Sequence, residues 1–393
     1  MRQASQAPSF AAASADLREL AELDISVTHL QRLSERIGQE WAEVRDEEVA
    51  AFRKDELPRA YAAAPRVAAV MLDGGRVQTR AEEAGRGVTD GGWQEVKVAC
   101  CLTLSSEAAL VDPQPEPPAK FLEPTQAARL AMEVKRRGKP ALGRAAKEAA
   151  AKKKKNKTRR RKKPRIRKLV RTVVATMADS ETFGWQMAAE VQKRGLDRAK
   201  RKACVCDGQH YNWSLFEMHL VMLGFIGILD FLHLLAYLYD AAHALHGKDK
   251  AAGWKCYEQW LRWAWSGQVA TLLRSLRAGA AKLGEPSAQT ADNDPRRILA
   301  DALGYVQNNR ERMDYSEYRR LGLPISSAPV ESTIKQINQR MKGSEKFWLE
   351  GGAEALLQVR AAYLSEDERA QQNWDRPRKH RRAAGPGRLA QAA

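Results

Sequence analysis

Cysteine is scarce in this sequence, and large apolar residues are sparse in its first twenty positions. Five cysteines among 393 residues are too few, and odd in number, for a disulfide-stapled scaffold, so a reducing compartment is the better fit. The opening residues, MRQASQAPSFAAASADLREL, contain no continuous apolar stretch. We therefore expect no secretory signal.

Long apolar runs are also rare. Residues 220–239 form one that is long enough to cross a bilayer, but Asp230 and His233 lie in its middle. A charge in lipid is costly, and a buried strand that ends at Asp230, followed by a core helix, explains the run without one. The sequence therefore argues against a membrane-spanning segment here.

Acidic residues are outnumbered by basic ones. The chain has 48 Asp and Glu against 66 Lys and Arg, which gives a formal net charge of +18. Residues 152–168 hold 13 basic residues and no acid, so 18 − 13 leaves +5 for the rest of the chain. Such a run either binds phosphate with little sequence preference or is a solvated linker, and a smaller basic patch occupies residues 376–388. The candidate DNA contacts in the run are Lys152, Lys153, Lys154, Lys155, Lys157, Arg159, Arg160, Arg161, Lys162, Lys163, Arg165, Arg167 and Lys168.

Changes in composition and hydrophobic pattern along the chain divide it into segments. With 44% hydrophobic and 29% charged residues, the composition allows a sizeable core. We expect a helical N-terminal region at 1–65, a core whose first part covers 66–231, a Pro-rich and basic insertion in it at 104–168, a helical domain at 232–322, further core helices at 323–365 and a basic flexible tail at 366–393.

Residues 16–56 have a helical pattern. An apolar stripe that begins at Val27 and includes Ile37 recurs with the helical period, and Asp24 or Ser26 can cap the helix that carries it. The segment fits the second half of a DNA-binding helix-turn-helix. A plain amphipathic helix explains it as well, and we favour that interpretation because the pattern is weak.

Two strands are expected before the insertion. Residues 66–73, RVAAVMLD, form an apolar run that ends at Asp73 and is followed by the turn residues Gly74 and Gly75. Residues 93–104 alternate in polarity, which predicts an antiparallel strand with one solvated face.

After the insertion we expect residues 169–178 and 181–195 to be helical. Two further apolar runs, 202–207 and 225–230, flank a helical stretch. A strand, a helix and a strand with apolar residues on both faces predict parallel central strands and an α/β fold.

Carboxylates stand at the ends of these apolar runs. Asp73, Asp207 and Asp230 each close one, and the carboxyl ends of neighbouring parallel strands converge on one crevice, where ligands bind. Each aspartate taken alone is better explained as a turn or cap residue, but three such endings in one domain weaken that explanation. Glu331 lies beside the buried stripe of a later helix, in the first turn after Pro329. There it is either a partner of the helix dipole or the last oxygen ligand of a hard cation.

Ordered blocks of the sequence resemble one family. They are MLDGGRVQTR, RKLVRTVVATMADSETFG, CVCDGQHYNWSLFEMH, ILDFLH with LYDAA, and LPISSAPVESTIKQINQRMKGSEKFW with GAEALLQVRA. Together, over about residues 66–363, they resemble the ISKra group of bacterial insertion-sequence transposases, which belongs to the DDE class. The resemblance implies an RNase H-like mixed-sheet core with a large helical insertion domain and a helical N-terminal region that binds DNA ends.

The resemblance also implies site residues. Asp73, Asp207 and Glu331 match the catalytic acids, which hold two Mg²⁺ (or Mn²⁺) ions. Asp230 and His233 look like the D-x-x-H motif that Mutator-like transposases carry between the second and third acids. The supporting residues are Asp230, His233 and Lys335.

The reaction implied is phosphodiester hydrolysis followed by strand transfer. Two divalent cations activate the attacking oxygen and stabilise the leaving one; water cuts first, and the freed 3′-hydroxyl then attacks target DNA. The implied partners are duplex DNA at the element's terminal inverted repeats, target DNA, and a second copy or more of the chain on DNA. The place is the bacterial cytoplasm, at the nucleoid, and an RNA partner stays open. A structure-selective nuclease on the same fold and an inactive or domesticated DNA-binding protein are the alternatives.

Two other motifs have simpler explanations. Cys204 and Cys206, with His210, suggest zinc, but they lack a matching second pair and are better explained as buried apolar residues. The four tryptophans of residues 254–265 predict packing of the helical domain. Stacking on an unpaired base at a DNA end is the alternative for them.

Overall fold

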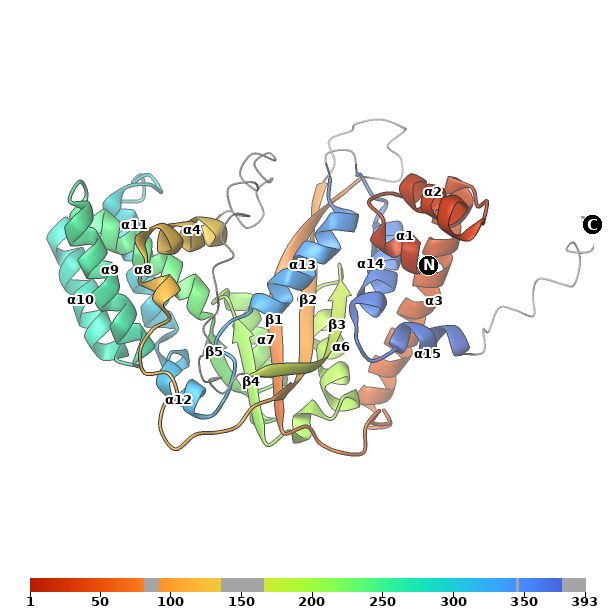
Figure 1. Cartoon of the computed structure of the whole chain (residues 1–393), viewed down its shortest axis with the longest axis horizontal. Coiled ribbons are helices and arrows are strands. Elements are labelled where there is room, and N and C mark those ends of the chain that lie inside the picture. Colours follow the sequence, from red (N-terminus) through yellow and green to blue (C-terminus); the bar gives the residue numbers. More distant parts are fainter. Residues whose placement is uncertain (81–91, 136–165, 344–345, 377–393) are drawn as a thin grey trace, which may run out of the picture.

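The computed structural model describes residues 1–80, 92–135, 166–343 and 346–376 (Figure 1). It is a mixed α/β structure with one five-stranded sheet, which confirms the predicted α/β class. Within these ranges, no helix is both long and apolar enough to cross a membrane. The apolar run at 220–239 is divided between a short strand and the helix that follows it, with Asp230 at the junction as predicted.

The sheet combines antiparallel and parallel pairing. Its strands are β1 (Val67–Thr79), β2 (Gly92–Ser105), β3 (Arg167–Thr176), β4 (Arg201–Cys206) and β5 (Ile226–Leu229). Their order across the sheet is β3-β2-β1-β4-β5. Neighbours among β1, β2 and β3 are antiparallel, whereas β4 runs parallel to β1 and β5 parallel to β4. The parallel strands expected near residues 202–207 and 225–230 are confirmed.

The prediction of a helix at 169–178 is wrong. This segment belongs to β3, which pairs antiparallel with β2. Its run of β-branched residues, including Val170, Thr172, Val173 and Val174, favours a strand, because branched side chains lose rotamer freedom in a helix and pack well on a pleated surface.

The prediction of one solvated face for β2 is also wrong. Residues Val96–Thr103 of this strand are buried or nearly so on both faces. Lys97 is the polar residue in this strand that suggests a solvated face. Its ammonium group lies 3.6 Å from Glu95 and donates to the Ala178 carbonyl at 3.0 Å, so the charge is buried with partners.

Helices cover both faces of the sheet. The flanking helices are α6 (Ser180–Lys193), α7 (His210–His219), α13 (Ala328–Met341) and α14 (Glu350–Leu364). A Cβ added to Gly74 would lie 3.6 Å from the Tyr211 hydroxyl on α7, whereas one added to Gly75 would lie 3.5 Å from Ile334 on α13. Since consecutive strand residues point to opposite faces, α7 and α13 cover opposite sides of β1.

The N-terminal region is helical, with α1 (Arg2–Gln6), α2 (Phe10–Ala21) and α3 (Val27–Arg53). Ser26 caps α3 by accepting a hydrogen bond from the His29 amide at 3.2 Å. Of the two predicted caps, the N-cap is therefore Ser26 and not Asp24. Helix α3 packs against α14 and buries Ile37 and Trp41. The apolar stripe is therefore used for packing within the chain.

The segment predicted as a basic flexible tail, 366–393, begins with ordered structure. It contains α15 (Arg369–Asp375), whose Trp374 ring meets Trp41 edge-on with centroids 6.0 Å apart. The prediction is wrong for this part, because the aromatic contact and the buried ion pair between Arg369 and Glu190 of α6 hold α15 on the core. Residues 377–393 lie outside the described residues.

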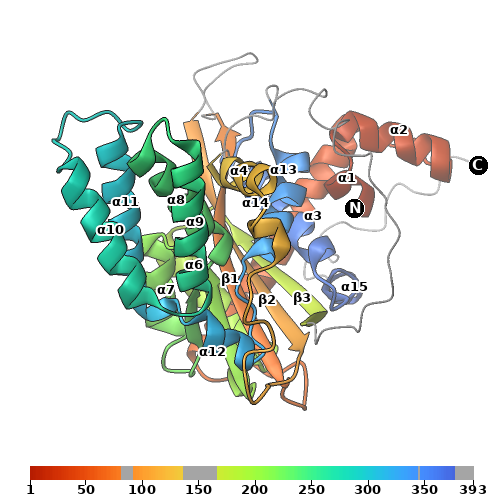
Figure 2. The same cartoon turned by 60° about the vertical axis from the view of Figure 1, so that its left-hand side comes forward.

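A group of helices lies on the side of the sheet away from α1–α3 (Figures 1 and 2). It consists of α4 (Pro124–Lys135), α8 (Phe231–His246), α9 (Lys250–Trp265), α10 (Val269–Leu283), α11 (Pro295–Asn308) and α12 (Tyr315–Arg320). Of the four tryptophans in α9, Trp260 and Trp265 are fully buried in this group, as packing predicts.

The predicted insertion at 104–168 is bounded by the sheet. β2 ends at Ser105 and β3 begins at Arg167, so Arg167 and Lys168 are sheet residues and Lys168 pairs with Glu366. The remaining basic residues of the run, at 152–165, lie outside the described residues.

Candidate metal centre

Three aspartates lie side by side on neighbouring parallel strands. Leu72 of β1 pairs with Cys206 of β4, and Cys206 pairs with Leu229 of β5. Asp73, Asp207 and Asp230 each follow the paired residue directly, so they occupy the same level of the sheet. The sequence missed one detail: Asp73 does not end its strand, because β1 continues to Thr79 beside β2.

Asp207 is held by the turn that joins β4 to α7. Its Oδ1 atom accepts hydrogen bonds from the Gln209 amide at 3.1 Å and from Asn212 Nδ2 at 3.0 Å. The Tyr305 hydroxyl of α11 donates to the Asp207 backbone carbonyl at 2.6 Å. These contacts fix the direction of the Asp207 carboxylate before any ligand is bound.

The next residue, Gly208, makes this arrangement sterically feasible. Its φ of +94° lies in a region that L side chains rarely adopt, and an added Cβ would lie 2.7 Å from Tyr305 Cε2. We expect Gly208→Ala to lower the unfolding free energy by at least about 1 kcal/mol and to displace Tyr305.

The matched control is Gly304→Ala, next to Tyr305 on α11. An added Cβ there meets nothing within 4 Å, so the variant should be neutral or more stable by about 0.5–1 kcal/mol. Urea unfolding of the two variants checks this. Equal stability of Gly208→Ala and the wild type would contradict the close approach of Tyr305.

Glu331 reaches the site from α13. As predicted, Val330, Ile334, Ile337 and Met341 form the buried stripe of this helix. Ile334 packs over Gly75, and Gly75 lies on the same face of β1 as Asp73, two residues away. The helix that carries Glu331 therefore covers the face of the sheet to which Asp73 points.

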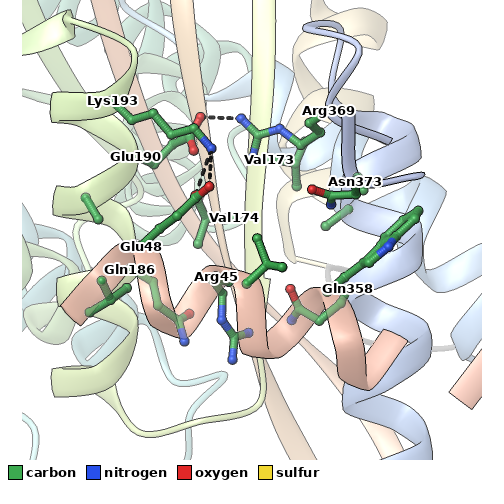
Figure 3. Close-up of a pocket in the computed structure, with 16 residues that line it drawn as sticks. Arg45, Glu48, Val173, Val174, Gln186, Glu190, Lys193, Gln358, Arg369 and Asn373 are labelled. Atoms are coloured by element: carbon green, nitrogen blue, oxygen red, sulfur yellow. Dashed lines mark hydrogen bonds and ion pairs between the residues drawn. The ribbon is translucent and has the colours of Figure 1, made fainter. Parts of the chain in front are cut away.

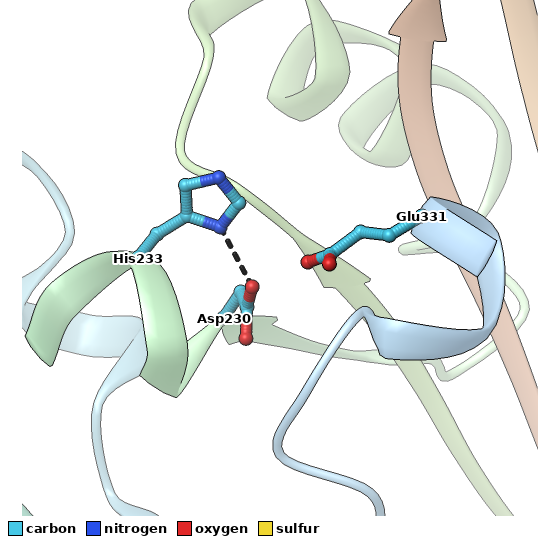
Figure 4. A group of neighbouring side chains, drawn as sticks. All are labelled: Asp230, His233 and Glu331. Atoms are coloured by element: carbon cyan, nitrogen blue, oxygen red, sulfur yellow. Dashed lines mark hydrogen bonds and ion pairs between the residues drawn. The ribbon is translucent and has the colours of Figure 1, made fainter. Parts of the chain in front are cut away.

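Asp230, His233 and Glu331 form a compact cluster (Figure 4). One ligand atom from each can be chosen so that the three lie within 4.8 Å of one another. His233 Nδ1 lies 2.6 Å from Asp230 Oδ2. Carboxylate oxygens suit Mg²⁺ or Mn²⁺, whereas an imidazole nitrogen suits a transition metal such as Zn²⁺ or Fe²⁺. This mixed donor set therefore fits a divalent metal ion but does not select Mg²⁺.

Ser327 completes the cluster, and sequence reasoning missed it. Its hydroxyl lies 2.9 Å from Asp230 Oδ2 and 3.1 Å from Glu331 Oε1, and it can donate its single proton to either carboxylate. The residue stands at the N-cap position of α13 but makes no side-chain cap bond. The sequence LPISSAP before a helix predicts a helix cap. It does not predict that Ser327 contacts Asp230 and Glu331.

The Asp230 carboxylate is ionised although it is fully buried. Burial raises its pKa, but hydrogen bonds from His233, the Leu232 amide and Ser327, together with the charge of His233, lower it further, so the net pKa lies below the usual value. A buried anion that is kept charged is a suitable ligand for a cation.

Three tyrosines near the acids keep their protons. Burial raises the pKa values of Tyr211, Tyr237 and Tyr305 above that of a free phenol, and nearby carboxylates add to the rise. The Tyr211 hydroxyl is buried with no hydrogen-bond partner among the described residues. None of the three is poised as a phenolate nucleophile.

The cluster does not contain the predicted acids Asp73 and Asp207, nor the other predicted residues. Lys335 is exposed on α13, one turn beyond Glu331. The sulfur atoms of Cys204 and Cys206 lie 3.6 Å apart, and both thiols are fully buried. Burial raises the pKa of Cys206 well above its usual value, which disfavours the thiolate that zinc requires.

A cavity lies between α3, α6, α14 and α15 (Figure 3). Its volume is about 70 Å³, room for a few water molecules and too little for a nucleotide. Ion pairs line it, among them Glu190 with Arg369 and Glu48 with Lys193. We interpret this cavity as part of the packing of α15.

Comparison with known proteins adds no relative. No protein-family model matches the chain, and no curated protein matches it significantly. The site is therefore interpreted from its own geometry and chemistry.

Proposed function

We propose that the chain is a DDE-type transposase that cuts DNA and joins it with the help of two divalent metal ions. The observation that carries the proposal is the placement of Asp73 and Asp207 at one level of adjacent parallel strands, with Glu331 on the helix that covers the same face. In the structure Glu331 clusters with Asp230 and His233, and neither Asp73 nor Asp207 is part of that cluster. The proposal therefore requires the three acids to converge when metal ions and DNA are bound.

The sheet supports the RNase H-like core that the family resemblance implies. Three antiparallel strands come first in the chain, and two parallel strands are then added beside β1, in the order β3-β2-β1-β4-β5. This order places the first two acids on adjacent strands near the middle of the sheet, and it brings the third in on a late helix.

The site residues have separable roles in this proposal. Asp73, Asp207 and Glu331 would hold Mg²⁺ or Mn²⁺, which activates the attacking oxygen and stabilises the leaving oxygen when bound. His233 is oriented by its hydrogen bond to Asp230, and Ser327 bridges Asp230 to Glu331. These two contacts hold Glu331 in a defined position before the ions enter.

The raised pKa values of the nearby tyrosines support direct hydrolysis. A covalent phosphotyrosine route needs a phenol that loses its proton readily, and Tyr211, Tyr237 and Tyr305 are shifted the other way. The shifts thus disfavour a tyrosine nucleophile, in keeping with the water and DNA 3′-hydroxyl that two-metal phosphoryl transfer uses.

The test uses the purified chain and a plasmid that carries the DNA flanking its gene. We expect nicks at the ends of the element and joined products with Mg²⁺ or Mn²⁺, and neither with EDTA. Nicks without joining would favour the structure-selective nuclease. Binding without nicks in any divalent metal would favour the inactive DNA-binding protein.

A further inference from the structure

Two tyrosines beside the acids form a parallel stack. The rings of Tyr237 on α8 and Tyr305 on α11 lie 4.0 Å apart between centroids, with an interplanar angle of 14°. Every other aromatic pair in the described part of the chain is tilted or edge-on. Parallel stacking presents a flat π face outward, which edge-on packing does not.

Tyr305 is the fixed member of the stack. Its hydroxyl is bonded to the backbone carbonyl of Asp207 at 2.6 Å, and its ring lies against Gly208, where a Cβ would collide with it. The position of the stack is therefore tied to the backbone that carries the second acid.

Tyr237 is the outer member. It is 37% exposed, although most large side chains of α8 are buried. It stands four residues after His233, so the two side chains lie on the same face of the helix one turn apart. Asp207 contributes to the raised pKa of Tyr237, which places the ring within electrostatic reach of that acid.

The charges around Tyr237 disfavour a phosphate there. Asp240 and Asp301 also raise its pKa, so the ring has acidic neighbours on both α8 and α11. An uncharged ring can approach such a place more easily than the DNA backbone can.

We propose that the exposed face of Tyr237 is a stacking platform for an unpaired nucleobase of the DNA being cut. This subsite rests on the proposed function, since it is the metal site that places the strand beside Tyr237. Stacking needs a flat π face and no particular hydrogen-bond pattern, so the subsite accepts any base. The sequence offers the tryptophans of α9 as the alternative stacking site, but Trp260 and Trp265 are buried in the packing of the helices.

The experiment uses a forked DNA end with 2-aminopurine as the unpaired base, and Ca²⁺ in place of Mg²⁺ so that the DNA is bound but not cut. Wild type should quench the fluorescence by stacking. Tyr237→Ala should abolish the quench and weaken binding to the fork by about five- to a hundredfold, while binding to a fully paired end changes little. Tyr237→Phe keeps the π face and should behave as wild type.

Trp93→Ala is the matched control. Trp93 is 50% exposed on β2, where Lys342 lies 5.1 Å from its ring centroid, so it is the alternative platform at a different place. A quench that depends on Trp93, or one that Tyr237→Ala leaves intact, overturns the proposal. So does a Tyr237→Phe variant that is as impaired as Tyr237→Ala, because the hydroxyl would then be the active group.

The two proposals fail in different ways. If metal-dependent nicking requires Asp207 but the fluorescence quench does not depend on Tyr237, the transposase proposal is supported and the stacking platform is contradicted. If the quench requires Tyr237 but no divalent metal supports nicking, the stacking platform is supported on a DNA-binding protein and the transposase proposal is contradicted. Circular dichroism of Tyr237→Ala, which alters a partly exposed side chain, checks that the variant is folded.

Discussion

Asp207→Asn is expected to lower the rate of metal-dependent DNA nicking by about a thousandfold or more. The lost negative charge is needed to hold the cations, and several kcal/mol of transition-state stabilisation depend on them. Asparagine keeps an Oδ1 atom that can accept from the Gln209 amide and Asn212, so the turn should survive. The measurement compares nicking of a labelled DNA end with gel retardation of the same DNA.

The retardation should be almost unchanged, because a carboxylate without metal repels phosphate and contributes nothing to binding. Asp292→Asn is the matched control. It removes the same charge from an exposed residue between α10 and α11, and its nicking rate should equal that of the wild type. If Asp207→Asn also nicks at the wild-type rate, Asp207 is only a turn residue and the two-metal mechanism is wrong for this chain.

Local sequence was enough to find the acids on the sheet. Asp73, Asp207 and Asp230 are visible because each follows an apolar run directly, and an apolar run that is buried on both faces is recognisable as a central strand. Glu331 is visible because a regular buried stripe fixes the face of α13 on which it lies. In these cases the local pattern and the tertiary structure agree.

Contacts between distant segments could not be found in this way. Ser327 bridges Asp230 to Glu331 only because the end of β5 meets the start of α13, and 97 residues separate Ser327 from Asp230 along the chain. Tyr305 reaches the Asp207 carbonyl across a separation of 98 residues. Neither contact leaves a local pattern, since each depends on how the helices after β5 return to the sheet.

The two wrong strand predictions have related causes. The segment at 169–178 contains residues found in helices and strands alike, but its β-branched residues favour the strand that the structure shows. In β2, Lys97 indicates a solvated face because lysine is seldom buried without a partner. Glu95 is a neighbour on the same strand, but the Ala178 carbonyl becomes evident as a partner only when β3 pairs with β2 and Lys97 lies opposite Thr176.

The largest expected effect on stability concerns the ion pair that holds α15. Glu190 on α6 is almost fully buried and pairs with Arg369, which also pairs with Asp367. Burial raises the pKa of Glu190, but the charge and hydrogen bond of Arg369, aided by Lys193 and Thr172, lower it further, to about 2. Arg369→Met should therefore leave a buried carboxylate short of its main partner.

We expect Arg369→Met to lower the unfolding free energy at pH 7 by about 3–5 kcal/mol, the usual cost of removing one partner of a buried pair. Lys193 and Thr172 remain near Glu190, so the lower end of that range is the better expectation. Urea unfolding gives the value. The surface variant Arg18→Met is the control, because the side chains of Arg18 and Asp24 are 66% and 79% exposed and such pairs contribute at most about 1 kcal/mol.

The pH dependence separates a lost charge partner from lost packing. In the wild type, the low pKa of Glu190 adds stability above the unfolded-state pKa, about 4.3, and this contribution is lost as the pH falls toward 2. In Arg369→Met the folded-state pKa of Glu190 should rise, so the penalty is present at neutral pH and shrinks as the carboxyl takes up a proton. The difference in unfolding free energy between variant and wild type should accordingly be smaller at pH 4 than at pH 7.

A second substitution, Glu190→Gln, should recover much of the stability that Arg369→Met loses at pH 7, because a neutral amide does not need the guanidinium. A difference that is independent of pH, with no recovery in the double variant, would mean that Arg369 stabilises α15 by packing alone.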